Sequence, residues 1–363
     1  MTGTKIGLLG TGNIAPVYIK AAQHFPVLDL RAIAGRNPQV TKALADEAGI
    51  AAMDIPTMLA DPEIEIIVNL TTPEAHFDTS MAVLEAGKHL YSEKPLGVDV
   101  TEAQTLLRTA AARGLQVGGA PDTFLGQAVQ TGRAYLDTGK LGTVMGASLN
   151  FLSPGHERWH PNPHFFYQPG GGPLYDVGPY YISALVALLG PVASVSGLRA
   201  RPRANRPWAN PATGQAQDIE VNVDTHITGL LQMASGAIVT MSMSFDVAKT
   251  GSRDIEIYGT EGTLSLPSPG AFGGVVEVSG PDRVWQQLTP QHGFGDENYR
   301  IIGAADMAQA LRDRRPMRTS GDLMHHIVEI MDGVMHSAQT GARVSMQTAP
   351  KRPAAVDPTE SWH

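Results

Sequence analysis

The first third of the chain alternates short apolar runs with amphipathic segments. The apolar runs predict strands and the segments between them predict helices. The predicted strands are 6–10, 28–34, 64–70, 89–92 and 115–118, and the predicted helices are 13–24, 39–48, 74–86 and 101–113. The run 64–70 is almost entirely apolar, which is typical of a strand buried on both faces. Repeated strand–helix units of this length predict a parallel, doubly wound sheet.

The pattern changes after about residue 122. A helix over 126–137, a strand over 144–152, a loop over 153–173 and a helix over 177–189 are followed by a series of strands, at 192–198, 219–233, 237–247, 254–258, 263–266 and 275–278. Strands in succession at this spacing predict a mostly antiparallel sheet. Helices return at 302–312 and 321–337.

The fold class expected from these patterns is α/β, with a Rossmann sheet followed by an α/β domain that carries a large, open-faced sheet. We place the dinucleotide-binding domain at 1–122 and the substrate-binding and oligomerisation domain at 123–347. The Pro-rich, polar segment 348–363 is predicted to be a surface or disordered tail.

Composition narrows the classes of partner. The formal net charge is −8 and there is no cluster of Lys and Arg, so nucleic acid and anionic membranes are not expected as partners. The chain has no apolar run of membrane-spanning length and no apolar leader, which predicts a cytoplasmic protein. With no cysteine it forms no disulfide and no thiolate metal site.

The segment Gly10-Thr11-Gly12-Asn13-Ile14-Ala15 has the pattern G-x-G-x-x-A between an apolar strand and a helix. Gly10 permits the tight turn, Gly12 lets the backbone approach a pyrophosphate, and Ala15 permits close packing of helix on strand. The free N–H groups of the following helix favour phosphate. We expect Gly10, Gly12, Asn13 and Ile14 to bind a dinucleotide.

The end of the second predicted strand reads Ala34-Gly35-Arg36-Asn37. NAD sites usually place an acidic residue there to hold the ribose hydroxyl groups. None is present, and Arg36 could pair with a 2′-phosphate, which favours NADP(H) over NAD(H). The alternative is that Arg36 stacks on the adenine or is merely solvated.

Two further strand ends carry candidate groups. Thr71, Thr72, Pro73 and His76 follow the third strand, and Ser92-Glu93-Lys94-Pro95 follows the fourth. Ligands of such sheets lie beyond the carboxyl ends of the strands, so we expect Thr71, Thr72, Pro73, His76, Glu93, Lys94 and Pro95 to reach the cofactor. His76 could instead be a residue of the helix surface. Lys94 could also hydrogen-bond a hydroxyl group undergoing oxidation. Asp122, past the next strand, is a further candidate for substrate contact, or an ordinary loop aspartate.

A glycine-rich segment, 170–181, precedes the predicted helix of the second domain. It contains Asp176 and Tyr180, which are four residues apart and so share one face of a helix. An acceptor and a phenol on one face suit a polyol substrate. Read alone, Asp176 could simply cap the helix.

The loop before that segment is rich in aromatic and histidine side chains. Trp159 could stack on a sugar ring and His160 could reach its hydroxyl groups. His156, His160 and His164 have a helical spacing that would suit a metal, but Pro161 and Pro163 oppose a helix there and hydride transfer needs no metal. We therefore predict no metal.

Together these segments resemble the Gfo/Idh/MocA family, the glucose–fructose oxidoreductase and inositol dehydrogenase superfamily. The resemblance runs from Gly10 through Glu93-Lys94-Pro95 and the glycine-rich segment to the late strand and turn at 257–263. It implies hydride transfer between a nicotinamide and a carbinol carbon of a sugar, cyclitol or related diol. It also implies that Lys94 touches the reacting hydroxyl group, that Asp176 binds substrate, and that oligomers form by pairing of the open sheets.

One position departs from many members of that family, which have a histidine four residues after the aspartate. Here the residue is Tyr180, as in the glucose–fructose oxidoreductase and dihydrodiol dehydrogenase branches. The ordinary pKa of tyrosine, about 10, is high for a base at neutral pH, and a nearby ammonium group such as that of Lys94 would lower it. We predict that Tyr180 is the acid/base, with Lys94 and Asp176 as the other catalytic groups. The alternative is that Tyr180 only shapes the pocket and that His160 or His326 moves the proton; of the adjacent His325 and His326, only one is expected to face the cleft.

The predicted function is an NADP(H)-dependent dehydrogenase or reductase acting on a sugar, cyclitol, glycoside or related diol. Two alternatives remain open: a glycosidase or epimerase that oxidises its substrate transiently with a tightly bound cofactor, and a non-catalytic cofactor-binding sensor. A homodimer or homotetramer is expected to form through the strands at 219–233 and 237–247. In the second of these, Val239, Met241, Met243 and Phe245 alternate with small polar residues.

Overall fold

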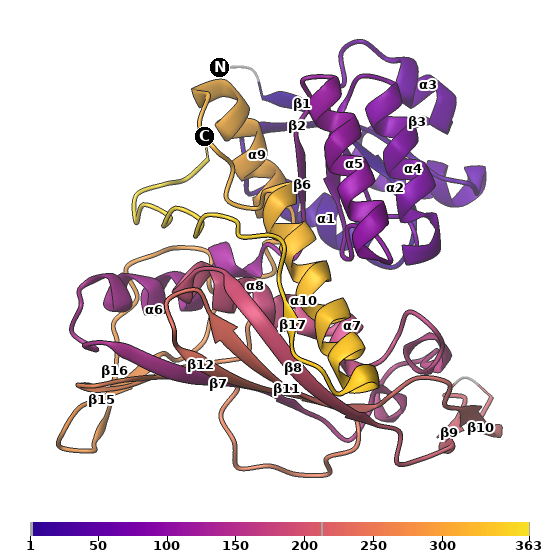
Figure 1. Cartoon of the computed structure of the whole chain (residues 1–363). Coiled ribbons are helices and arrows are strands. Elements are labelled where there is room, and N and C mark those ends of the chain that lie inside the picture. Colours follow the sequence, from indigo (N-terminus) through magenta and orange to yellow (C-terminus); the bar gives the residue numbers. More distant parts are fainter. Residues whose placement is uncertain (1–2, 212, 363) are drawn as a thin grey trace.

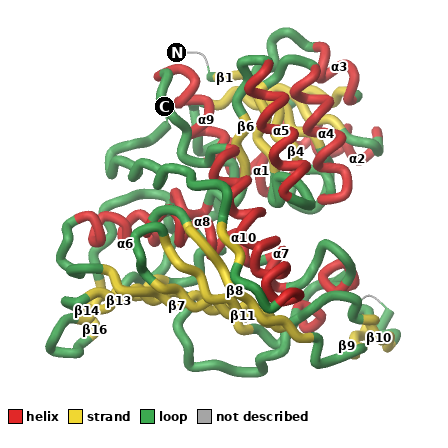
Figure 2. Tube along the Cα trace, in the orientation of Figure 1, coloured by secondary structure: helices red, strands yellow, loops and turns green. Residues whose placement is uncertain are grey.

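The computed structural model describes residues 3–211 and 213–362. Figure 1 shows two domains, one above the other, and Figure 2 shows that helices gather around and above a broad lower sheet. The predicted α/β fold class is confirmed.

The first domain is built on a parallel sheet of six strands in the order β3-β2-β1-β4-β5-β6. The strand β4 is fully buried, as its apolar sequence predicts. The strands and helices alternate along the chain: β1 (Thr4–Leu9), α1 (Ala15–Ala22), β2 (Leu28–Ala34), α2 (Pro38–Ala48), β3 (Ala51–Met53), α3 (Ile55–Ala60), β4 (Ile66–Asn69), α4 (Pro73–Glu85), β5 (His89–Ser92), α5 (Val100–Ala112) and β6 (Val117–Gly119). The short elements β3 and α3 were not predicted.

The second domain is built on a mixed sheet of nine strands in the order β16-β15-β14-β13-β7-β12-β11-β8-β17. All its pairs are antiparallel except that of β7 with β12. The strands are β7 (Val144–Leu152), β8 (Val192–Ala200), β11 (His226–Met233), β12 (Ile238–Ser244), β13 (Ile255–Gly259), β14 (Gly262–Leu266), β15 (Glu277–Ser279), β16 (Trp285–Gln287) and β17 (Val344–Ser345).

The predicted strand over 219–233 is wrong in its extent. It consists of β10 (Ala216–Glu220), which pairs with β9 (Asn205–Ala209) in a separate ribbon, and of β11, which enters the large sheet. Between Glu220 and His226 the chain leaves the two-stranded ribbon of β9 and β10 and enters the large sheet. Hydrophobic pattern alone does not show such an exchange of partner strands.

Helices cover one face of the large sheet and join the two domains. They are α6 (Gln127–Asp137), α7 (Pro173–Asp176), α8 (Gly178–Leu189), α9 (Ile302–Asp313) and α10 (Gly321–Thr340). In Figure 1, α6, α8 and α10 lie above the sheet, on the side of the first domain. The helix α10 packs against β8 of the sheet and also against α5 and β6 of the first domain. Because helices after residue 300 contact both domains, the division at residue 122 stays a prediction.

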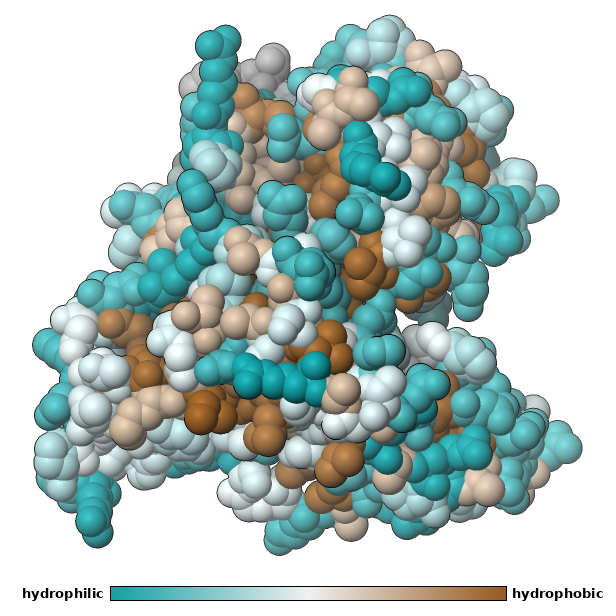
Figure 3. Space-filling view, in the orientation of Figure 1, coloured by the Kyte–Doolittle hydropathy of each residue, from teal (hydrophilic) through white to brown (hydrophobic). Residues whose placement is uncertain are grey.

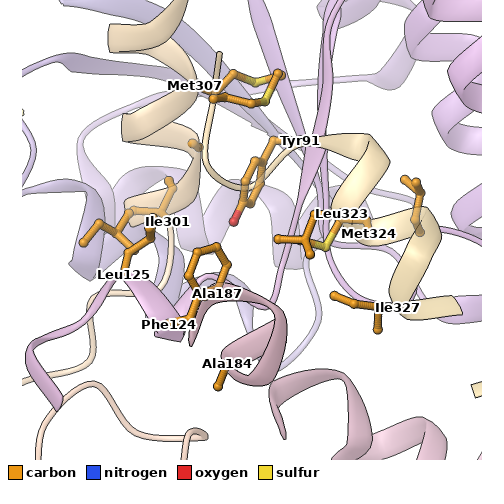
Figure 4. Packing of buried hydrophobic residues seen from close by; sticks show 14 of the residues in the cluster. Tyr91, Phe124, Leu125, Ala184, Ala187, Ile301, Met307, Leu323, Met324 and Ile327 are labelled. Carbon is orange, nitrogen blue, oxygen red and sulfur yellow. The ribbon is translucent and has the colours of Figure 1, made fainter. Parts of the chain in front are cut away.

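The interface between the domains is a continuous apolar core. Figure 4 shows Tyr91 of β5 among residues of the short 3-10 helix Thr123–Leu125 and of α8, α9 and α10. The labelled neighbours are buried: Phe124, Leu125, Ala184, Ala187, Ile301, Met307, Leu323, Met324 and Ile327. Burial of this surface fixes the two domains relative to each other.

The segment from Thr348 to Trp362 runs over the surface, where most of its residues are exposed or half-buried, and a few buried side chains anchor it. Val356 and Trp362 are buried, and the Trp362 ring lies 6.1 Å from that of Phe25 in the first domain. Arg318 and Glu360 form an ion pair at 2.7 Å. The Pro-rich composition of the tail reflects an extended path across both domains rather than disorder.

Within the described residues, no helix is both long enough and apolar enough to cross a lipid bilayer.

Candidate active site

The glycine-rich turn after β1 forms an open cradle. Gly10 has φ +124°, and a Cβ atom placed on it would lie 2.6 Å from the carbonyl carbon and oxygen of Leu70. Only glycine fits there. A Cβ atom on Gly12, in contrast, would meet nothing within 4 Å in the described part of the chain. The space in front of Gly12 is therefore free for a ligand, and α1 begins next to it, at Ala15.

A cavity of about 340 Å³ lies along this turn. Its walls come from the carboxyl ends of three neighbouring strands: Gly10, Thr11 and Gly12 after β1; Gly35, Arg36 and Asn37 after β2; and Thr71 and Thr72 after β4. Arg36 is exposed at its rim, and among the described residues it has no ion-pair partner. The cavity fits the phosphates and adenosine of a dinucleotide, with free backbone N–H groups on one side and a guanidinium group on the other.

A second cavity, of about 380 Å³, lies between the domains. Pro73 and Pro95 line it from the first domain, and Pro169 and Tyr175 line it from the second. Figure 3 shows the surface hollowed between the two lobes on the same side of the molecule as α4 and α7. Pro73 and Pro95 are thus accessible beside the dinucleotide cavity.

His76 occupies a different place from the one predicted. It is buried, with 1% of its surface exposed, and its ring nitrogens lie 2.8 Å from the carbonyl oxygen of Thr71 and 2.9 Å from that of Pro95. The predicted direct contact with a cofactor is corrected. His76 ties together the two loops that carry Thr71 and Pro95, and acts on a ligand only through them.

Glu93 also holds the loop that carries Lys94. One carboxylate oxygen accepts a hydrogen bond from the Tyr18 hydroxyl group at 2.7 Å, and the other accepts one from the Lys94 backbone N–H at 2.9 Å. The side chain of Lys94 is thereby directed away from the first domain and towards α7.

Lys94 meets Asp176 across the domain boundary. The ammonium nitrogen donates to the Asp176 carboxylate at 2.9 Å and to its backbone carbonyl oxygen at 2.8 Å. Burial would lower the pKa of Lys94, but the carboxylate of Asp176, together with Tyr180 and Glu93, raises that pKa above the ordinary lysine value. Burial would likewise raise the pKa of Asp176, but Lys94 and His156 bring it below its usual range. Both groups are therefore charged at neutral pH.

His156 holds the other oxygen of the same carboxylate. Its Nε2 lies 3.0 Å from Asp176 Oδ2, and its Nδ1 accepts a hydrogen bond from the indole N–H of Trp159 at 3.2 Å. Because an indole nitrogen only donates, Nδ1 carries no proton and Nε2 does. Trp159 thus selects the tautomer of His156 that donates to Asp176.

Tyr180 lies beside this group, at the start of α8. The Lys94 ammonium nitrogen is 5.7 Å from the centre of the Tyr180 ring. The guanidinium of Arg300 donates a long hydrogen bond, of 3.4 Å, to the Tyr180 hydroxyl oxygen. The predicted catalytic residues Lys94, Asp176 and Tyr180 are therefore brought together, and Arg300 joins them.

Asp122 does not face a substrate, and that prediction is corrected. It is buried, and its Oδ2 accepts hydrogen bonds from the Tyr91 hydroxyl group and from the backbone N–H groups of Ile301 and Gly303. It anchors the turn that leads into α9. Such a role could not be read from sequence, because Asp122 and Ile301 are 179 residues apart.

The histidines proposed as alternative proton carriers lie in different surroundings. His326 is buried in α10, where it accepts from the Val192 backbone N–H at 3.0 Å, and burial lowers its pKa to about 4. His325 is also buried in α10. His160 is half-buried, with Nδ1 accepting from the Asn162 backbone N–H. His326 therefore belongs to the core of the second domain and is not an acid/base candidate.

Sequence reasoning missed two residues of this site. His156 was considered only as one of three loop histidines, and its contact with Asp176 depends on the fold of the 153–173 loop. Arg300 lies 120 residues from Tyr180, and no local motif marks it.

Within the described residues no group of three His, Cys, Asp or Glu side chains is arranged to hold a metal ion.

Alanine substitutions at Gly10 and Gly12 give a matched pair of variants that tests whether the cradle binds a dinucleotide. Gly12→Ala should fold with an unchanged Tm, because its methyl group meets open space, but should weaken binding of a nicotinamide dinucleotide at least tenfold. Gly10→Ala should lower Tm, because its methyl group would collide with the Leu70 carbonyl group. Calorimetric titration and thermal melts of both variants measure this. Unchanged affinity in Gly12→Ala would contradict the assignment of the cradle.

Comparisons with known proteins agree with this geometry. Residues 4–119 match the oxidoreductase family with an NAD-binding Rossmann fold, and residues 129–265 match the GFO/IDH/MocA C-terminal domain. The D-xylose 1-dehydrogenase (NADP(+)) 2 of Haloferax volcanii is 24% identical over 94% of this chain and 99% of its own. The scyllo-inositol 2-dehydrogenase (NADP(+)) of Bacillus subtilis is 21% identical over 94% of this chain and 96% of its own.

Solved structures show the same fold over nearly the whole chain. An NAD-binding oxidoreductase from Klebsiella pneumoniae has a TM-score of 0.81 at 21% identity and covers 95% of this chain and 99% of its own. A levoglucosan dehydrogenase in complex with NADH has a TM-score of 0.80 at 20% identity and covers 96% of this chain and 100% of its own. With both of its domains matched, the chain belongs to the Gfo/Idh/MocA family of oxidoreductases.

Proposed function

We propose that this oxidoreductase transfers hydride between NADP(H) and a carbinol carbon of a sugar, cyclitol, glycoside or related diol. The observation that carries the proposal is the Lys94 ammonium group, held at 2.9 Å by Asp176 beside Tyr180. These groups lie next to the carboxyl edge of a sheet with a dinucleotide cradle. The named activities of the relatives, which include a xylose and an inositol dehydrogenase, support the same class of substrate.

Each catalytic side chain has a role that follows from its hydrogen-bonding capacity. Two of the three ammonium protons of Lys94 are directed at Asp176, which leaves the third for a substrate hydroxyl group. The charge of Lys94 favours the alkoxide that develops when that hydroxyl group loses its proton. Tyr180 takes up the proton in oxidation and returns it in reduction. Asp176 orients Lys94 and contributes to binding of the substrate hydroxyl groups.

When bound, the nicotinamide ring supplies the acceptor or donor of the hydride. We propose that the dinucleotide is held by Gly10, Gly12, Arg36, Thr71 and Thr72, which line the first cavity, by Pro73 and Pro95, which line the second, and by Asn13, Ile14 and Lys94, with Glu93 fixing the backbone of Lys94.

We expect the loop from Ser153 to Pro173 to contact the substrate. Trp159 is 65% exposed although its indole N–H is bound to His156, so much of its ring faces solvent, and the His156 ring links it to the Asp176 carboxylate. An exposed aromatic face of this kind suits stacking on a sugar ring. His160 packs edge-on against Trp159, with ring centres 5.2 Å apart.

The first experiment follows reduced nicotinamide by absorbance in the presence of sugars, cyclitols and glycosides. The wild type should give a substrate-dependent signal. In Tyr180→Phe, kcat should fall roughly 100- to 10,000-fold, because that variant lacks the proton carrier.

Since the pKa of Lys94 is raised and that of Asp176 lowered, both stay charged between about pH 5 and pH 10, and neither should shape the pH profile in that range.

The other outcomes of that experiment are informative. Tight cofactor binding with a retained, copurifying dinucleotide and no net turnover would favour an enzyme that oxidises its substrate transiently. Binding without any reaction, and a cellular role that survives Lys94→Ala, would favour a cofactor-binding sensor.

The preference for NADP(H) rests on Arg36. This residue is exposed at the rim of the cradle, where the 2′ position of the adenosine ribose would lie, and none of the described residues that line the cavity is acidic. Arg36→Ala should weaken NADP⁺ binding about tenfold or more and leave NAD⁺ binding within about twofold, because only NADP⁺ carries the 2′-phosphate. Equal losses for the two cofactors, in calorimetric titrations, would show that Arg36 stacks on the adenine instead.

The uncovered face of the large sheet is the proposed subunit interface. Thr228, Thr240 and Ser242 lie on neighbouring strands, whereas Val239, Met241 and Met243 of β12 are fully buried on the opposite face. On the same face, Leu198, which pairs with Thr228, is 75% exposed, and Ile238 of β12 is 61% exposed. Small polar residues with apolar neighbours suit flat pairing of two sheets. We therefore expect a homodimer or homotetramer, and a monomer in light scattering at micromolar concentration would contradict this.

A further inference from the structure

The turn before α9 is held in an unfavourable backbone conformation. Ile301 has φ +100° and ψ −8°, a region that a β-branched residue enters only under constraint. Its side chain is fully buried in the core between the domains, beside Leu125 in Figure 4. Strained residues of this kind persist where the surrounding structure over-determines them, and they are concentrated at functional sites.

Asp122 supplies the constraint. Its Oδ2 accepts from the backbone N–H groups of Ile301 at 3.1 Å and Gly303 at 3.0 Å, and from the Tyr91 hydroxyl group at 3.0 Å. Hydrogen bonds to a buried carboxylate are among the stronger ones in proteins. The turn is therefore fixed both by this carboxylate and by the packing of the Ile301 side chain, and so is the direction in which the preceding residue, Arg300, leaves the backbone.

Arg300 projects from this turn towards the catalytic group. Its Nη2 atom lies 3.4 Å from the Tyr180 hydroxyl oxygen and 3.4 Å from the carbonyl oxygen of Gly270. Its Nη1 atom lies 3.1 Å from Asn298 Oδ1. The guanidinium carbon is 5.7 Å from the centre of the Tyr180 ring. In the described ranges, no carboxylate comes within ion-pair distance of Arg300, so its contacts leave its charge uncompensated at close range.

Lys94 differs in this respect. Its ammonium group donates to the carboxylate of Asp176, which neutralises the pair, and it lies 5.7 Å from the centre of the Tyr180 ring. The charged groups around Tyr180 are thus Arg300 from the turn before α9 and Lys94 from the loop after β5, with Asp176, Glu93 and Asp122 behind them. Of these two cations, Arg300 is the one that donates a hydrogen bond to the Tyr180 hydroxyl oxygen within the described part of the chain.

We propose, on the basis of the hydride-transfer function proposed above, that Arg300 is the positioning residue that stabilises the deprotonated Tyr180 oxygen during proton exchange. In the oxidation direction, the O–H bond of the substrate carbinol breaks and its proton passes to the phenolate oxygen. The hydride from the same carbon passes to the nicotinamide, so that the alcohol is oxidised and the dinucleotide reduced. Arg300 donates to the phenolate before this transfer, and Asp122 and Ile301 hold it in place.

The test is a spectroscopic titration of tyrosinate absorbance in the full-length protein without substrate. The chain has nine tyrosines. Burial raises the pKa of seven of them, namely Tyr18, Tyr91, Tyr167, Tyr175, Tyr181, Tyr258 and Tyr299. The difference between the wild type and Tyr180→Phe isolates the signal of Tyr180 from the rest.

Arg300→Gln should move the midpoint of that signal to higher pH by about one to three units, because an opposite charge at this distance favours the ionised form. Arg300→Lys should restore part of the shift. Arg108→Gln removes one positive charge from the exposed surface of α5 and should leave the midpoint where it is in the wild type. The same order of variants is expected in the alkaline rise of kcat/KM for alcohol oxidation.

An unchanged midpoint in a folded Arg300→Gln variant would overturn the proposal. If Arg300→Gln fails to fold, an unchanged midpoint in Asp122→Asn, which weakens the anchor of the turn but keeps Arg300, would do so. Because the titration needs no turnover, it separates the two proposals: a shift of the midpoint in a protein that oxidises no polyol would support the role of Arg300 and refute the proposed function.

Discussion

The contact between Lys94 and Asp176 is the interaction on which the candidate site depends. Lys94 comes from the loop after β5 of the Rossmann sheet, and Asp176 comes from α7 at the edge of the second domain. Neither domain contains both charges, so the pair exists only when the domains are docked. The side chains are about four-fifths buried, so each charge would be costly to keep without the other.

The apolar core between the domains supplies that docking, and the polar groups around it supply the alignment. Tyr91 packs among residues of α8, α9 and α10 while its hydroxyl group donates to Asp122. Asp122 fixes the turn that presents Arg300, Glu93 fixes the backbone of Lys94, and His156 fixes the carboxylate of Asp176. Catalytic side chains need such supporting contacts, because small displacements of the reacting groups greatly lower the reaction rate.

The sequence was most informative where function depends on local backbone chemistry. The glycine turn and the strand ends that carry Arg36, Thr71 and Lys94 were predicted, because each is set by residues close together in the chain. The prediction that Asp176 and Tyr180 share one helix is wrong, because Asp176 ends α7 and Tyr180 belongs to α8. The sequence was least informative where a residue acts on a distant one. Asp122 and His76 are residue types that often bind ligands, but in this fold both are buried and hydrogen-bond to the backbone of other loops. Arg300 and His156 acquire their roles only through partners 120 and 20 residues away.

The central claim is that this site moves a hydride between a carbinol carbon and the nicotinamide. It is tested most directly by giving the enzyme NADP⁺ and a polyol that carries deuterium on the reacting carbon, and by examining the recovered cofactor by proton NMR. The account predicts that deuterium appears at C4 of the reduced nicotinamide. Loss of the deuterium to water, or a cofactor that is never labelled while the polyol is consumed, would contradict it.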